Sequence, residues 1–264
     1  MKTYGKIDDF YIREDEEFLI KDILPSYYIG ENLDKENVSA DYVLRFLQNE
    51  LNELLHSFAN GGFSHKGYLF FPLINGVSKN NVNRIKKLKE IAIFLTDNGY
   101  DFSNSIKAYK NNVKTNINFA TILSSLYQDF SCIKNKNTKS INKSNCTELD
   151  LSSYKKSDLG YLRPLNELKN YANRHLEQYL AGFYLHGSFA TKDYVKGWSD
   201  VDTLAVVSKK TIENPKSLLE FRNMMYYMRH FLYKIDPLQH HGSIIISEYD
   251  LENYCQVYFP VEIF

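Results

Sequence analysis

Three short apolar runs near the end of the sequence limit what the last hundred residues can fold into. The runs cover 181–186, 201–207 and 243–247, and each is short, rich in branched side chains and bounded by turn residues or lysines. Such runs predict strands. Apolar residues at helical spacing occupy 165–179 and 215–235, and Asn214 with Pro215 marks the start of the second helix. The resulting order is helix, strand, strand, helix, strand, which predicts an α/β (α+β) domain.

The first half of the chain shows helical spacing instead. Stripes of apolar residues run through 47–58, 82–95 and 120–130. The first stripe stops at Asn60, where two glycines follow, and Ser78 has the character of a cap for the second. We therefore expect a mostly helical N-terminal domain over residues 1–133.

The stretch between these two parts is polar. Lys134 to Asn145 consists of Lys, Asn, Ser and Thr with a single Ile, and the polar residues 152–158 follow soon after. A segment of this kind buries too little apolar surface to offset the entropy of ordering it. We expect a flexible linker over 134–160 and a C-terminal domain over 161–264.

Charge and hydropathy exclude several classes of protein. The 32 basic and 32 acidic residues cancel, which disfavours a general binder of nucleic acid or of anionic membranes. No apolar run approaches the ~20 residues that span a bilayer. The acidic N-terminus does not resemble a signal peptide, and three widely spaced cysteines make neither a disulfide framework nor a zinc site. These features predict a cytoplasmic protein without a membrane partner.

The residues between the first two predicted strands have the chemistry of a phosphate and metal site. Gly187 and Ser188 follow the first strand directly, where a residue without Cβ lets the backbone approach a ligand and present free N–H groups. Asp200 and Asp202 come at the start of the next strand, and their spacing directs both carboxylates to one face. Two carboxylates together with substrate phosphates suit Mg²⁺.

This pattern resembles the DNA polymerase beta-like nucleotidyltransferase superfamily over the last ~100 residues. The pattern of that superfamily is a hydrophobic residue, Gly, and Gly or Ser, followed after a gap by Asp, hydrophobic, Asp or Glu, hydrophobic. Here the gap from Phe189 to Ser199 fits, and Thr203 matches the last hydrophobic place only in part. The resemblance implies a short mixed sheet with flanking helices. It also implies that Gly187 and Ser188 bind the phosphates of a nucleoside triphosphate, and that Asp200 and Asp202 bind Mg²⁺ or Mn²⁺.

Relatives usually supply a third carboxylate from a later strand, and the third predicted strand contains none. In an extended strand His241 and Ser243 share the more polar face, so His241 is the candidate for this place, with Asp236 and Glu248 as alternatives. A histidine is a poor ligand for Mg²⁺ but a plausible base, and a merely structural role for it stays open.

Two functions from different classes follow from this resemblance. The first is a metal-dependent nucleotidyltransferase that moves a nucleoside monophosphate from a triphosphate to a hydroxyl of a small molecule or a protein, releasing pyrophosphate. The second is a catalytically impaired relative that binds a nucleotide or a partner protein as a regulator. Extension of a nucleic acid is disfavoured because the net charge is zero and no basic stripe is present.

Overall fold

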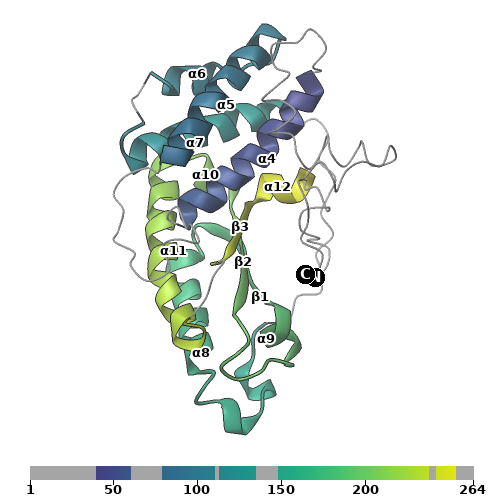
Figure 1. Cartoon of the computed structure of the whole chain (residues 1–264), viewed down its shortest axis with the longest axis vertical. Helices are drawn as coiled ribbons and strands as arrows, with labels where there is room; N and C mark the ends of the chain where they lie inside the picture. Colours follow the sequence, from purple (N-terminus) through teal and green to yellow (C-terminus); the bar gives the residue numbers. More distant parts are fainter. Residues whose placement is uncertain (1–39, 61–78, 111–112, 135–147, 238–241, 254–264) are drawn as a thin grey trace, which may run out of the picture.

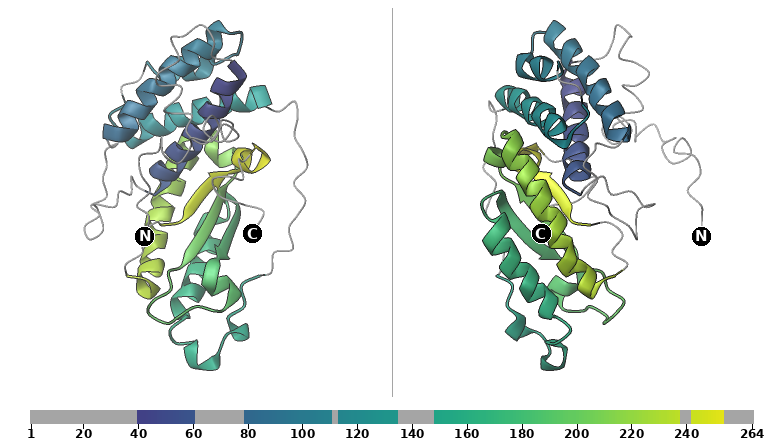
Figure 2. Two further views of the ribbon diagram at one scale, coloured as in Figure 1. Left: turned by 45° about the vertical axis from the view of Figure 1, so that its right-hand side comes forward. Right: turned by 90° about the vertical axis from the view of Figure 1, so that its left-hand side faces the viewer.

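The structure is a computed structural model that describes residues 40–60, 79–110, 113–134, 148–237 and 242–253. The four described helices within residues 40–134 gather at one end of the molecule (Figures 1 and 2). They are α4 (Ala40–Ala59), α5 (Lys79–Asp97), α6 (Ser103–Ala108) and α7 (Asn116–Lys134). The three apolar stripes of the sequence fall within α4, α5 and α7, so the prediction of a mostly helical first part is confirmed for the described residues.

Helices and strands alternate in the second part, as the sequence predicts. After the short turns η2 (Leu151–Ser153) and η3 (Lys156–Asp158), the elements are α8 (Arg163–Tyr171), η4 (Ala172–Leu176), β1 (Leu180–His186), α9 (Gly187–Thr191), β2 (Asp202–Val207), α10 (Lys209–Ile212), α11 (Pro215–Ile235), β3 (Ile244–Ser247) and α12 (Glu248–Asn253). The helix predicted over 165–179 differs: α8 ends at Tyr171 and continues as the wider π turn η4.

The three strands form a mixed sheet in the order β1-β2-β3. β1 and β2 are antiparallel, and β2 and β3 are parallel. The register places His186 opposite Asp202 on one side of β2 and Ile244 beside Leu204 on the other. The starts of β2 and β3 and the end of β1 therefore lie at the same end of the sheet.

The two faces of the sheet have different surroundings. Ala205, Val207 and Ile245 belong to the main hydrophobic cluster, which also contains buried side chains of α4, α7, α8 and α11. On the opposite face, Leu204, Val206 and Ile246 form a small separate cluster. Because side chains alternate along a strand, Asp202 shares the face of Leu204 and Val206 and not that of the helices.

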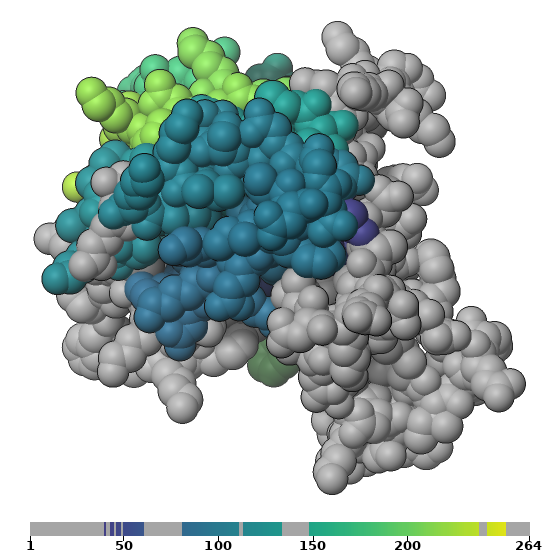
Figure 3. Space-filling view, turned by 90° about the horizontal axis from the view of Figure 1, so that it is seen from above, coloured from purple at the N-terminus to yellow at the C-terminus, as the bar shows by residue number. Residues whose placement is uncertain are grey.

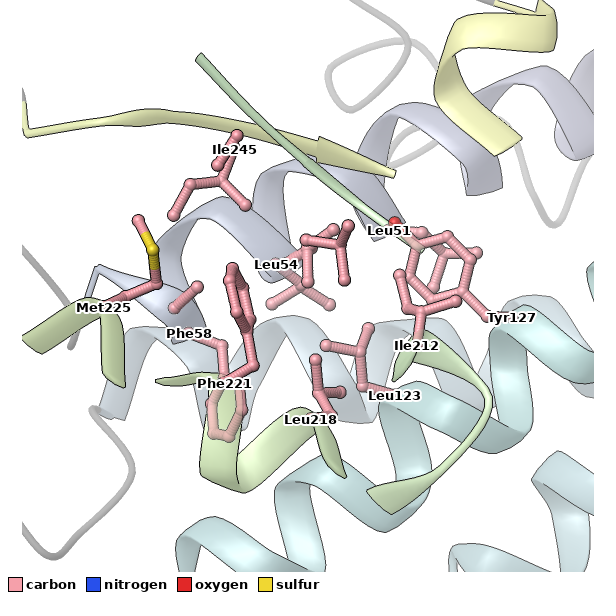
Figure 4. Close-up of a cluster of buried hydrophobic side chains, with 14 of the residues drawn as sticks. Leu51, Leu54, Phe58, Leu123, Tyr127, Ile212, Leu218, Phe221, Met225 and Ile245 are labelled. Atoms are coloured by element: carbon pink, nitrogen blue, oxygen red, sulfur yellow. The ribbon is translucent and has the colours of Figure 1, made fainter. Parts of the chain in front are cut away.

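The main cluster joins the N-terminal helices to the sheet. Figure 4 shows side chains from α4, α7, α10, α11 and β3 packed together, among them Leu54, Phe221 and Ile245. The expected division into a domain over 1–133 and a domain over 161–264 stays a prediction. In the described residues, the helices of the first part and the sheet of the second share one continuous core.

Part of the expected linker, 148–160, is described, and it contacts the rest of the fold. Asp150 accepts a hydrogen bond from the backbone N–H of Ser152, and the buried Tyr154 donates its hydroxyl to the carbonyl of Phe189. Residues 135–147 lie outside the described residues. None of the described helices combines the length and the apolar character that crossing a bilayer requires.

We expect trypsin to cut the folded protein first between Lys134 and Thr147, because this segment carries four lysines and no apolar face. The two fragments should still elute together in size-exclusion chromatography under native conditions, since α4 and α7 share buried contacts with α11. Earlier cuts within 181–207 would contradict the expected boundary, and separation of the native fragments would contradict the shared core.

Candidate functional site

The turn from β1 to α9 brings the backbone of Gly187 against the carboxylate of Asp202. Gly187 has a φ of +65°, in the left-handed region that favours glycine. A Cβ on this residue would lie 2.4 Å from Oδ2 of Asp202. The carboxylate therefore occupies the space that any other side chain would fill, and the position requires glycine for both reasons.

Asp200 and Asp202 flank a buried residue at the start of β2. Val201 between them is fully buried, while both aspartates are partly exposed. This alternation agrees with two carboxylates on the solvent-facing side of the chain, and Asp202 is the first residue of β2. The structure thus brings Asp202 together with Gly187, and it leaves Asp200 accessible two residues earlier.

The donor set suits a hard cation that also binds substrate oxygens. Among the described residues, no group of three or more His, Cys, Asp or Glu side chains is arranged to hold a metal ion. A pair of carboxylates is nevertheless what Mg²⁺ commonly takes from a protein when phosphates supply further ligands. Asp200 and Asp202 fit that role, and the missing ligands would come from a substrate.

His241, the candidate for the third place, lies outside the described residues. The strand argument for it does not hold, because Gly242 has a φ of +65° and interrupts the extended backbone that the argument requires. Ser243 is buried, with its Oγ 2.7 Å from Oγ1 of Thr203, and Ile245 packs in the main cluster. The more polar face of this strand therefore faces the helices rather than the aspartates.

The two acidic alternatives lie in different places. Glu248 follows the carboxyl end of β3 and accepts a hydrogen bond from the backbone N–H of Lys209, just after the carboxyl end of β2. Asp202 lies at the opposite end of β2, five residues before Val207, which is roughly 17 Å along the strand. Glu248 is therefore excluded from the site. Asp236 ends α11, six residues before Gly242, and is half-buried.

The loop from α9 to β2 is anchored by Asp158. The carboxylate of Asp158 lies 2.7 Å from Nζ of Lys196 and accepts a hydrogen bond of 2.8 Å from the hydroxyl of Tyr194. Hydrogen bonds from Lys196, Tyr194 and Ser157 lower the pKa of this carboxyl to about 2. The ring of Tyr194 stacks on that of Phe189 with 4.7 Å between centroids. These contacts fix the loop that carries the residues before Asp200.

Lys192 is the lysine directly after α9. Among the described contacts it is not part of a salt bridge. Its Nζ lies 5.6 Å from the centre of the Tyr154 ring. Lys196 is paired with Asp158, and Lys209 and Lys210 follow the far end of β2. Trp198 is 88% exposed, so the structure does not bury it in the core.

A cavity of about 1060 Å³ runs along the free edge of β1 and reaches Gly187. Residues of α8, η4 and the segment 148–154 line its other side, including Tyr154 and Lys169. Thr191 and Lys192 line the end near α9. Sequence reasoning missed the contribution of 148–154 and α8, because it assigned the first to a linker and the second only to the core.

The comparisons with known proteins place a family domain over this region. Residues 165–238 match the model of the nucleotidyltransferase domain family, and this match includes Gly187, Ser188, Asp200 and Asp202. No curated protein matches the chain, and no solved structure matches it either. The match agrees with the three-stranded mixed sheet and with the aspartate beside the glycine turn. The chain therefore contains a nucleotidyltransferase domain, consistent with the polymerase beta-like nucleotidyltransferase superfamily.

Proposed function

We propose that the protein transfers a nucleoside monophosphate from a nucleoside triphosphate to a hydroxyl group of an acceptor, with Mg²⁺ or Mn²⁺. The oxygen of the acceptor attacks the α-phosphorus and forms a new P–O bond. The bond from the α-phosphorus to the bridging oxygen breaks, pyrophosphate leaves, and the proton of the hydroxyl passes to a base. The observation that carries this proposal is the contact of the Asp202 carboxylate with the backbone of Gly187.

Each proposed role follows from the local geometry. Gly187 and Ser188 open α9, where backbone N–H groups without helical partners are available to phosphate oxygens. Asp200 and Asp202 would hold the cation next to these phosphates. When bound, the cation neutralises charge on the phosphates and orients them for in-line attack. His241 stays the proposed base without the argument from strand parity, because the ordinary pKa of a histidine lies close to neutral pH.

The shape of the surface favours a compact acceptor, either a small molecule or a side chain of a protein. The cavity along β1 reaches Gly187, so a molecule inside it would approach the proposed phosphate site from the side of α8. A net charge of zero does not suit an extended polyanion. We therefore propose that nucleic acid is not the acceptor.

A regulator that has lost catalysis is the second candidate, and the position of Glu248 favours it. Two dications about 3.7 Å apart repel by roughly 18 kcal/mol at an effective dielectric constant near 20, and nearby anions must offset this repulsion. Glu248 lies at the far end of the sheet and cannot contribute. A protein that binds a triphosphate with one cation but releases no pyrophosphate would fit this second function.

Incubation with each labelled nucleoside triphosphate, with Mg²⁺ or Mn²⁺ and with a panel of hydroxyl-bearing acceptors, distinguishes the two functions. The proposed enzyme releases pyrophosphate and forms a labelled product. The regulator binds the triphosphate without either product. Absence of both binding and release would contradict the enzyme and the nucleotide-binding regulator, and would leave only a regulator that binds a partner protein.

Trp198 offers a direct measurement of binding, because it is the single tryptophan of the chain and precedes Asp200 by two residues. Its indole is 88% exposed, so its emission should respond to a ligand that arrives at the start of β2. We expect a saturable change in emission on adding triphosphate with Mn²⁺, and no change with Asp200 and Asp202 both replaced by Ala. An equal response from the double variant would contradict the assignment of the metal site.

A further inference from the structure

The end of α4 contacts the start of β3 next to the proposed site. Asn60 follows the last residue of α4 and is 1% exposed. Its Nδ2 donates a hydrogen bond of 3.0 Å to the carbonyl of Ser243, although 183 residues separate the two in the chain. His56, one helical turn earlier, accepts a hydrogen bond at Nδ1 from the backbone N–H of Ile245.

Buried arginines of α11 hold the end of α4 in place. Nη2 of Arg229 donates to Oδ1 of Asn60 at 2.9 Å and also to its backbone carbonyl. Nε of Arg222 donates to the carbonyl of Phe58 at 3.1 Å. The last carbonyls of a helix have no partners within the helix and carry partial negative charge, so two guanidinium groups stabilise this end.

The same contacts reach β2, the strand that begins at Asp202. Gly242 passes so close to Asn60 that a Cβ on it would lie 2.8 Å from Oδ1 of Asn60. Ser243, held at its carbonyl by Asn60, lies with its Oγ 2.7 Å from Oγ1 of Thr203, the residue after Asp202. A series of contacts therefore runs from Arg229 through Asn60 and Ser243 to β2.

We infer that Asn60 is a positioning residue, which sets the start of β3 against the start of β2 and thereby holds Asp202 beside Gly187. This inference rests on the proposed function for its effect on turnover. It assigns to the N-terminal helices a part in building the site. From the sequence, Asn60 is predicted only to end a helix. The inference gives it a further role, which is to position β3.

The substitution Asn60→Asp tests this role selectively. An aspartate keeps an oxygen for Arg229 but has no N–H for the carbonyl of Ser243. Burial lowers the pKa of Arg229 to about 10, so its guanidinium is still charged at neutral pH and would pair with the new carboxylate. We therefore expect the variant to fold, with a thermal midpoint close to that of the native protein.

The expected result combines turnover and hydrogen exchange. In Asn60→Asp, kcat should fall by at least about tenfold while KM for the triphosphate changes by less than about threefold, since the phosphates bind at α9. Exchange of the amide of Ile245 should accelerate by at least about tenfold. Ser243→Ala, which removes the hydroxyl contact with Thr203, should lower kcat in the same way and covers the case in which Asn60→Asp fails to fold.

Asn81→Asp is the matched control. Asn81 is also buried and exchanges hydrogen bonds with Ser57 of α4, but those contacts do not involve β3. Its replacement should lower stability without changing kcat or the exchange of Ile245. Native kcat together with native exchange in folded Asn60→Asp would overturn the inference. If the native protein itself shows no transfer, the proposed function fails, and the exchange at Ile245 alone decides the inference.

Discussion

Replacing Asp202 by Asn should lower transfer by at least roughly a hundredfold, because an amide oxygen does not neutralise a dication. The substitution preserves the size of the side chain beside Gly187. It should therefore leave the thermal midpoint and the far-ultraviolet circular dichroism unchanged. Initial rates of pyrophosphate release, measured over a range of Mg²⁺ and Mn²⁺ concentrations, give the comparison.

The exposed Asp193 provides the control for this experiment. It lies after α9 in the loop that leads to Asp202, and its carboxylate contacts the hydroxyl of Thr191. Asp193→Asn removes the same charge and should leave the rate within about twofold, as expected for an exposed substitution outside a binding site. If Asp202→Asn keeps the native rate with a native dependence on metal, the proposed metal site is wrong.

Replacing Gly187 by Ala should abolish most of the activity through a steric effect on Asp202. The new Cβ would lie 2.4 Å from Oδ2 of Asp202, so the carboxylate has to move. We expect a loss of roughly a hundredfold in kcat/KM, since a displacement of about 1 Å costs that much at a positioned site. The same assay, together with the emission of Trp198, separates lost binding from lost turnover.

Gly197→Ala separates this steric effect from backbone strain. Gly197 has a φ of +72°, close to that of Gly187, but a Cβ there would have no atom within 4 Å. Both substitutions place alanine in the left-handed region, at a cost of about 1–2 kcal/mol in the free energy of unfolding. Equal losses of activity in the two variants would show that strain, and not the position of Asp202, limits the reaction.

Local patterns predicted those parts of the fold whose signals lie close together in the chain. The helix over 215–235 is the best example, because Asn214 accepts hydrogen bonds from the N–H groups of Lys216 and Ser217, and Pro215 begins the helix. Five apolar residues at helical spacing within it are buried: Leu218, Phe221, Met225, Met228 and Leu232. The glycine turn before α9 was equally predictable, since Gly187 does adopt a positive φ.

Contacts between distant segments were not predictable in this way. The prediction for the third strand assumed regular alternation through Gly242, but the positive φ of that residue depends on its close packing against Asn60. The partner of Ser243 comes from a helix 183 residues earlier. A hydrophobic period reports which face of one element is apolar, and it carries no information on which element covers that face.

The described N-terminal helices differ in how close they come to the proposed site (Figure 1). Figure 3, which looks onto the end opposite the glycine turn, shows the side chains of residues 79–110 forming much of the described surface there. These helices lie away from α9, whereas α4 passes beneath them and ends at β3 (Figure 1). Among the described N-terminal helices, α4 is thus the one that connects this end with the proposed site.

The position of β3 has a consequence for anyone who produces the matched segment as an isolated protein. The family match ends at residue 238, but β3 covers Ile244–Ser247 and pairs with β2. A fragment with the boundaries of the match would keep β1, β2 and α11 but lose β3, so β2, the inner strand of the native sheet, would become a bare edge. Bare edges of this kind invite aggregation, so the shortest soluble version of this enzyme candidate has to extend past β3 and include α4.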